Sequence, residues 1–149
     1  MSRALIGALC TLFLLAGTRV AAEEDKDNID VEVWAIRATT KNKDISPELR
    51  ELAVKLRKDF KYTGFKLERR EAGRTQPGHG YTAELLSDYR GTVTPREREG
   101  KNLRLQFEAV RKGKSILNTT VTAPIGSFVP FAIGPLENDD FLITAVRAR

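Results

Sequence analysis

The sequence predicts an α+β fold: a mainly antiparallel β-sheet or sandwich with one amphipathic helix after the first strand. An apolar strand pattern at residues 29–38 is followed by an apolar stripe of helical spacing between residues 49 and 60. From residue 65 onward, apolar and polar residues alternate in short runs separated by turn residues, which is typical of successive antiparallel strands. Hydrophobic residues make up 41% of the 149, enough for one domain stabilised by its own core.

Residues 1–22 have the layout of a secretory signal peptide. Arg3 precedes an apolar run at Ala4–Ala16, which is shorter than the roughly 20 residues that span a bilayer. Small residues before the acidic start of residues 23–25 place the expected cleavage site after Ala22. An uncleaved anchor or a buried N-terminal helix is the alternative interpretation.

Removal of the leader leaves a single α+β domain at residues 23–149, which we expect in the periplasm or outside the cell. The loss of Arg3 and Arg19 lowers the net charge from +5 to +3, so specific nucleic-acid binding is not expected. The one cysteine, Cys10, leaves with the leader, which excludes a disulfide framework. The single histidine excludes a His-rich metal centre, and we expect no cofactor.

The first elements are a strand and a helix. Residues 29–38 become apolar on both faces at Trp34–Ile36, which predicts a strand at the centre of a sheet. A polar loop at residues 39–44 leads to a helix, with Ser46 as the expected capping residue and Pro47 at its first position. The stripe expected to lie on the sheet is Leu49, Leu52, Ala53, Leu56 and Phe60.

The middle of the chain gives the weaker patterns. Gly64 ends the helical unit, and a strand is expected to start at Phe65. A turn-rich loop is expected at residues 73–80 and a charged loop at residues 95–101. Between them lie weaker strand candidates at residues 81–86 and 89–94. The patterns leave open whether residues 72–100 form an ordered hairpin or a mobile loop.

The last third of the chain has clearer strand patterns. Residues 103–109 alternate regularly, and the turn at Lys112-Gly113 joins them to residues 116–123 as a hairpin. Pro130 predicts that residues 127–133 form an edge strand or an irregular one. A turn at residues 137–140 leads to a closing strand at residues 141–146.

Candidates for catalysis are few. His79 lies between glycines, where it could act as a general base or metal ligand, although the sequence gives it no partner and favours a solvated loop residue. A hydrolase that uses His79 and unidentified carboxylates remains a functional hypothesis, and it ranks third, behind the two described below. Residues 137–140 (ENDD) are acidic but lack the calcium-loop pattern, so a turn is expected there. No catalytic or metal-ligating residue is assigned.

Basic residues offer the second hypothesis, an anionic polymer or lipid surface bound by one basic face. Acidic residues are mixed through the same segment, and this favours a solvated surface with salt bridges. The residues of the expected basic face are Lys55, Lys58, Lys61, Lys66, Arg69 and Arg70.

Two segments carry a resemblance. Residues 34–39 with Leu52, Leu56 and residues 60–67, and residues 134–135 with 141–146, resemble a group of short exported Gram-negative bacterial proteins of unassigned function. The tail from Asn118 onward is similar to the final hairpins of outer-membrane secretin domains. These resemblances imply export and place envelope assembly among the expected processes, and they supply no catalytic residue.

The main hypothesis is an exported, non-enzymatic domain that acts through protein contact. It would be an accessory component of an envelope assembly, with an unknown envelope protein as its partner. An edge strand near Pro130 is the expected place where a partner strand could be recruited.

Overall fold

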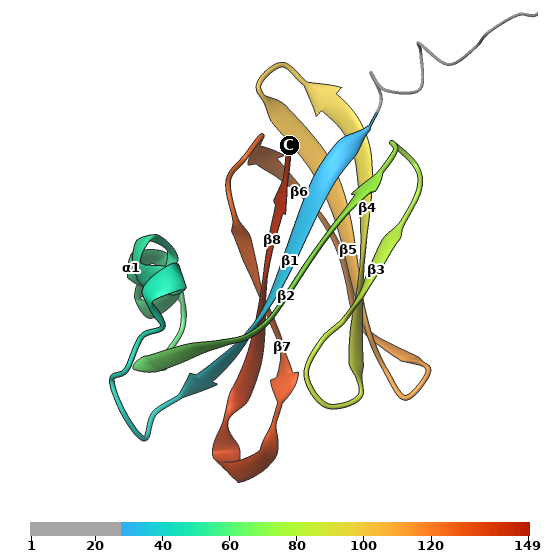
Figure 1. The fold of residues 1–149 in the computed structure, drawn as a ribbon. Coiled ribbons are helices and arrows are strands. Elements are labelled where there is room, and N and C mark those ends of the chain that lie inside the picture. The colour runs from blue at the N-terminus through green and yellow to red at the C-terminus, as the bar shows by residue number, and fades with distance from the viewer. Residues whose placement is uncertain (1–27) are drawn as a thin grey trace, which may run out of the picture.

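The computed structural model describes residues 28–149, so the expected leader at residues 1–22 lies outside the described residues. Two four-stranded antiparallel sheets pack face to face, with orders β2-β1-β8-β7 and β3-β4-β5-β6 (Figure 1). The expected α+β sandwich with one helix after the first strand is confirmed. The strands are β1 (Ile29–Thr39), β2 (Gly64–Thr75), β3 (Tyr81–Glu84), β4 (Tyr89–Glu99), β5 (Asn102–Arg111), β6 (Lys114–Pro124), β7 (Val129–Pro135) and β8 (Phe141–Ala148).

The one α-helix among residues 28–149, α1 (Arg50–Asp59), lies on the outer side of the first sheet (Figure 1). A short 3-10 turn, η2 (Pro47–Leu49), precedes it. Leu49 and Leu56 are fully buried against β1, β2 and β8, and Phe60 is half-buried, which confirms the apolar stripe. The molecule therefore has three layers: α1, the first sheet and the second sheet.

The main core lies between the two sheets. β1 is central, between β2 and β8, as its double-sided apolar pattern predicts. Val31 and Val33 point into this core, whereas Trp34 and Ile36 face the helix. Because side chains alternate along a strand, one strand contributes to both apolar layers.

The helix start differs from the expected cap. Ser46 occupies the N-cap position, but its side chain makes no capping hydrogen bond. Its Oγ instead accepts a 2.9 Å hydrogen bond from the Leu67 N–H of β2. Ser46 therefore attaches the helix entrance to the neighbouring strand, a contact that depends on the tertiary fold.

The region left open, residues 72–100, is mostly strand. β2 continues through Gly73–Thr75, so the expected loop is shortened to residues 76–80. The prediction of a charged loop at residues 95–101 was wrong, because β4 extends to Glu99. A register shift lies between Pro95 and Arg98 of this strand. Exposed charged side chains are compatible with strand where the neighbouring strand continues alongside.

The last third follows the sequence closely. Lys112 and Gly113 have φ values of 50° and 76°, as a two-residue hairpin turn between β5 and β6 requires. β7 lies at the edge of its sheet, as Pro130 predicts. Glu137–Asp139 forms a 3-10 turn before β8. In residues 28–149, no helix is long and apolar enough to cross a membrane.

Candidate functional site

The outer edge of β6 is an unpaired strand edge of the second sheet. β6 pairs with β5 on one side, and no other strand among the described residues pairs with its second side. No charged residue lies between Ser115 and Pro124. A strand with one unpaired side presents a row of free backbone N–H and C=O groups, so β6 is a template for a further strand.

The other three edges are less suited to pairing. β3 has only four residues. β7 contains two prolines and a register shift between Ala132 and Gly134. β2 carries several charged side chains, and its start is covered by Ile45, which bridges to Phe65 in parallel. Short length, proline, irregular register and charge all discourage strand addition, and β6 has none of these over residues 117–123.

Side chains on β6 alternate between the two faces of the second sheet. Leu117 and Val121 pack against the core between the sheets but remain half-buried. Asn118 and Thr120 are exposed. Val129, at the start of the neighbouring edge β7, is also half-buried. The core is therefore less completely covered on this side of the sandwich, next to the free edge of β6.

Three of the six expected basic residues lie on or beside the helix. Lys55 and Lys58 are exposed on α1, and Lys61 is exposed in the turn that follows it. Lys61 also lines a pocket with Lys43 and Arg57, two residues that were not part of the expected basic face. The sequence pattern does not group Lys43 with these residues, because Lys43 lies in the loop before the helix and is distant from them along the chain.

The other three lie on β2 and do not share one face. Lys66 is opposite Arg37 of β1, whereas Arg70 is opposite Trp34, and these two β1 residues point to opposite faces. Lys66 and Arg69 each lie near a glutamate two residues further along, at 3.6 and 2.9 Å. The Arg70 guanidinium lies over the Trp34 ring, 4.8 Å from its centroid. The register shift between Ala35 and Ile36 thus divides the basic residues of this strand.

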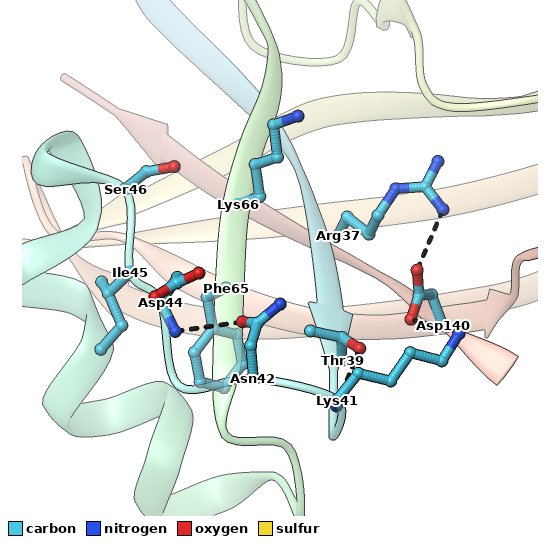
Figure 2. Close-up of a pocket in the computed structure, with 10 residues that line it drawn as sticks. All are labelled: Arg37, Thr39, Lys41, Asn42, Asp44, Ile45, Ser46, Phe65, Lys66 and Asp140. Carbon is cyan, nitrogen blue, oxygen red and sulfur yellow. Dashed lines mark hydrogen bonds and ion pairs between the residues drawn. The ribbon is translucent and has the colours of Figure 1, made fainter. Parts of the chain in front are cut away.

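A pocket of about 360 Å³ at the end of β1 contains an ion-pair network (Figure 2). Arg37 lies 3.3 Å from Glu68 and 3.4 Å from Asp140. Lys41 lies 3.9 Å from Asp140 and donates a hydrogen bond to the Asn138 carbonyl. Since carboxylates neutralise these cations, the network connects β1 to the turn before β8 and leaves little charge for a ligand.

His79 is exposed in the loop between β2 and β3. Its backbone N–H donates to Gln76, and its carbonyl accepts a 2.8 Å hydrogen bond from Thr75 Oγ1. No ion pair to its imidazole is present among residues 28–149. Its backbone contacts shape the loop, and the hydrolase hypothesis gains no partner residue from the structure.

The acidic segment at residues 137–140 forms a turn. Asn138 and Asp139 have φ values of 59° and 64°, in the left-handed region that Asn and Asp tolerate better than most residues. Within the described part of the chain, no group of three or more His, Cys, Asp or Glu side chains could hold a metal ion. The turn expected from this segment is confirmed.

Comparisons with protein-family models, curated proteins and solved structures found no match to this chain. The resemblance to short exported bacterial proteins therefore stays a prediction.

Proposed function

We propose that this chain is an exported, non-enzymatic domain that binds a partner protein of an envelope assembly by strand addition at β6. The observation that supports the proposal is the free outer edge of β6, which is long and uncharged between Ser115 and Pro124. Export is expected from the leader-like sequence at residues 1–22, and the edge supplies the mode of contact.

The sequence suggested the edge near Pro130, and the fold favours a different one. Pro130 lies on an edge strand, but each of the two prolines of β7 removes one backbone donor. β6 keeps all its donors up to Pro124. The partner strand is therefore assigned to β6 rather than to β7.

The chemistry of the expected partner follows from the side chains of β6. A strand added beside Leu117 and Val121 would place its own inward side chains over the half-covered core. Its outward side chains would lie beside Asn118 and Thr120, which favours polar residues there. The expected partner segment is extended, alternates apolar and polar residues, and lacks prolines in its centre.

Site-specific crosslinking in the producing cells tests the contact. A photoreactive amino acid replaces Thr120 on β6 in one variant, and Thr82, an exposed threonine on β3, in the matched control. We expect one dominant protein adduct from position 120 and none from position 82, with an extended partner segment at the crosslink. Equal crosslinking at both positions, or none at position 120, would overturn the proposal, and an adduct of two copies of this chain would replace the partner by self-association.

Two neighbouring proline variants separate loss of binding from loss of folding. Thr119 and Thr120 lie opposite Phe107 and Gln106 of β5. Along an antiparallel strand, successive residues direct their N–H groups alternately to the two sides. One of Thr119→Pro and Thr120→Pro should thus lose a β5 hydrogen bond and unfold more easily. The other should keep its melting temperature and lose the crosslink, read in both proline variants from a photoreactive residue at Thr122, another exposed position of β6. A stable variant that still crosslinks from position 122 would contradict strand addition.

A further inference from the structure

A second pocket, of about 460 Å³, lies where the loop before α1 meets the turn after it. Its lining contains three cationic side chains, two aromatic side chains and one threonine, and no acidic residue. We refer to it as the basic pocket. It is lined by Lys43, Arg57, Phe60, Lys61, Tyr62 and Thr63.

The positive charge of the basic pocket is not neutralised within the described residues. Lys43, Arg57 and Lys61 are all exposed, and none of them lies within 4.0 Å of a carboxylate oxygen in residues 28–149. The pocket at the end of β1 differs, because Arg37 and Lys41 there are paired with acidic side chains. Three like charges around one opening create a positive potential that attracts an anion.

The walls of the basic pocket are held in place by contacts that are already made. Thr63 donates its N–H to the Thr39 carbonyl at 3.0 Å and its Oγ1 to the Asn42 carbonyl at 2.5 Å. Asn42 Oδ1 accepts the Asp44 N–H at 3.0 Å (Figure 2). The Asn42 amide also fills the space that a Cβ at Gly64 would need. The two loops thus form one unit, and binding would require little ordering of the backbone.

The aromatic side of the basic pocket is also fixed. Tyr62 stacks on Phe141 of β8, with ring centroids 5.7 Å apart and planes inclined by 25°. Phe60 packs against the cluster between α1 and the first sheet. The rings form an apolar wall beside the three cations, so a ligand with an anionic group and a less polar remainder would fit both parts.

We propose that the basic pocket binds a phosphate monoester group. Arg57 can donate two parallel hydrogen bonds to phosphate oxygens, and the ammonium groups of Lys43 and Lys61 supply further charge. A phosphate monoester carries close to two negative charges at neutral pH, which matches three cations better than a single carboxylate does. The concave shape suits one such group, whereas a polymer would need a continuous row of cations.

Two variants of equal charge change test the assignment. Arg57→Gln removes a cation that lines the pocket, and Lys55→Gln removes one from the same helix that does not line it. Phenyl phosphate is titrated against the folded protein, followed by calorimetry and by the amide resonances of residues 61–63. We expect saturable binding that weakens about tenfold or more in Arg57→Gln and less than about twofold in Lys55→Gln. No saturable binding, or equal losses in both variants, would overturn the proposal.

Vesicles then separate the two sources of such a group. Phosphatidylcholine vesicles that contain phosphatidic acid present a monoester, and vesicles with phosphatidylglycerol present a diester. Preferential binding to phosphatidic acid that depends on Arg57 would support the pocket and identify a lipid headgroup. Binding of phenyl phosphate without vesicle binding would support the pocket and identify a soluble monoester. Equal binding to both vesicles with no effect of Arg57→Gln would show a diffuse basic surface and contradict the proposal.

Discussion

The hydroxyl of Tyr89 on β4 donates a 2.9 Å hydrogen bond to the carbonyl of Pro135 on β7. A side chain of the second sheet is thereby bonded to the backbone of the first. The phenol ring is almost fully buried, with 1% of the residue exposed. Arg111 covers the ring, with its guanidinium 4.7 Å from the ring centroid, and donates to the hydroxyl at 3.1 Å.

Tyr89→Phe tests this link between the sheets. The variant keeps the ring but removes this hydrogen bond to the Pro135 carbonyl and the one from Arg111, which keeps its contact with Asp88. We expect a loss of about 1 kcal/mol in the free energy of unfolding, measured by urea titration. Tyr62→Phe, whose hydroxyl makes no hydrogen bond with a described side chain, is the control and should change it by less than about 0.5 kcal/mol. Equal effects would assign the loss to something other than the Tyr89 hydroxyl.

Gly134 is required by the same contact. A Cβ at Gly134 would lie 2.5 Å from the Tyr89 hydroxyl oxygen, so the Gly134→Ala variant must displace the ring or the strand. We expect Gly134→Ala to lower the free energy of unfolding by about 1–3 kcal/mol. In the Tyr89→Phe background the nearest clashing atom is absent, so the cost of Gly134→Ala should fall. A double-mutant cycle measures this coupling, and strictly additive effects would show that the two residues do not interact.

The helix contributes stability through its buried face. Leu56 is fully buried between α1 and the first sheet, whereas Val54 on the same helix is 75% exposed. We expect Leu56→Ala to lower the free energy of unfolding by about 2–5 kcal/mol. Val54→Ala should change it by less than about 0.5 kcal/mol. Thermal and urea unfolding of both variants would check the difference. Comparable losses in unfolding free energy would mean that α1 does not bury Leu56 and expose Val54 as described.

Asp88 gives a prediction about pH. Partial desolvation raises the pKa of its carboxyl, but hydrogen bonds from its own backbone N–H and from Arg111, with the charges of Arg111 and Lys112, together lower it below the ordinary 3.8. A lowered pKa in the folded state stabilises the protein above the unfolded pKa, and this contribution is lost as the pH falls through the folded pKa. Stability should therefore decline less on acidification in Asp88→Asn than in the unmodified chain.

Urea midpoints at about pH 6 and at about pH 2 measure this dependence, since the first lies above and the second well below the ordinary pKa of an aspartate. Asp59→Asn is the control, because Asp59 forms no ion pair among residues 28–149. An unchanged pH dependence in Asp88→Asn would show that the Arg111 contact does not stabilise the fold.

Local patterns predicted the elements that local physics controls. The apolar stripe of α1, the double-sided strand β1 and the turn at Lys112-Gly113 follow from residue spacing and from turn chemistry. The charged end of β4 was missed because a pattern of Arg and Glu resembles a loop. It becomes strand only because Asn102 and Leu103 of β5 pair with it.

The candidate site was predicted only in part. The sequence identified residues 116–123 as a strand and residues 127–133 as an edge. It did not show that β6 is also an edge, since that depends on which strands pair with it. The basic pocket was missed for a related reason, because Lys43 joins Arg57 and Lys61 only after Thr63 binds the loop before the helix.

The sequence alone determined the α+β class, the helix after the first strand and the hairpins, since each depends on neighbours within a few residues. The tertiary structure decided the order of the strands, the free edge of β6, the opposite faces of Lys66 and Arg70, and the grouping of three cations in one pocket. These features depend on contacts between distant segments, and a register shift of one residue reverses which face a side chain occupies. Residue spacing along the chain does not contain that information.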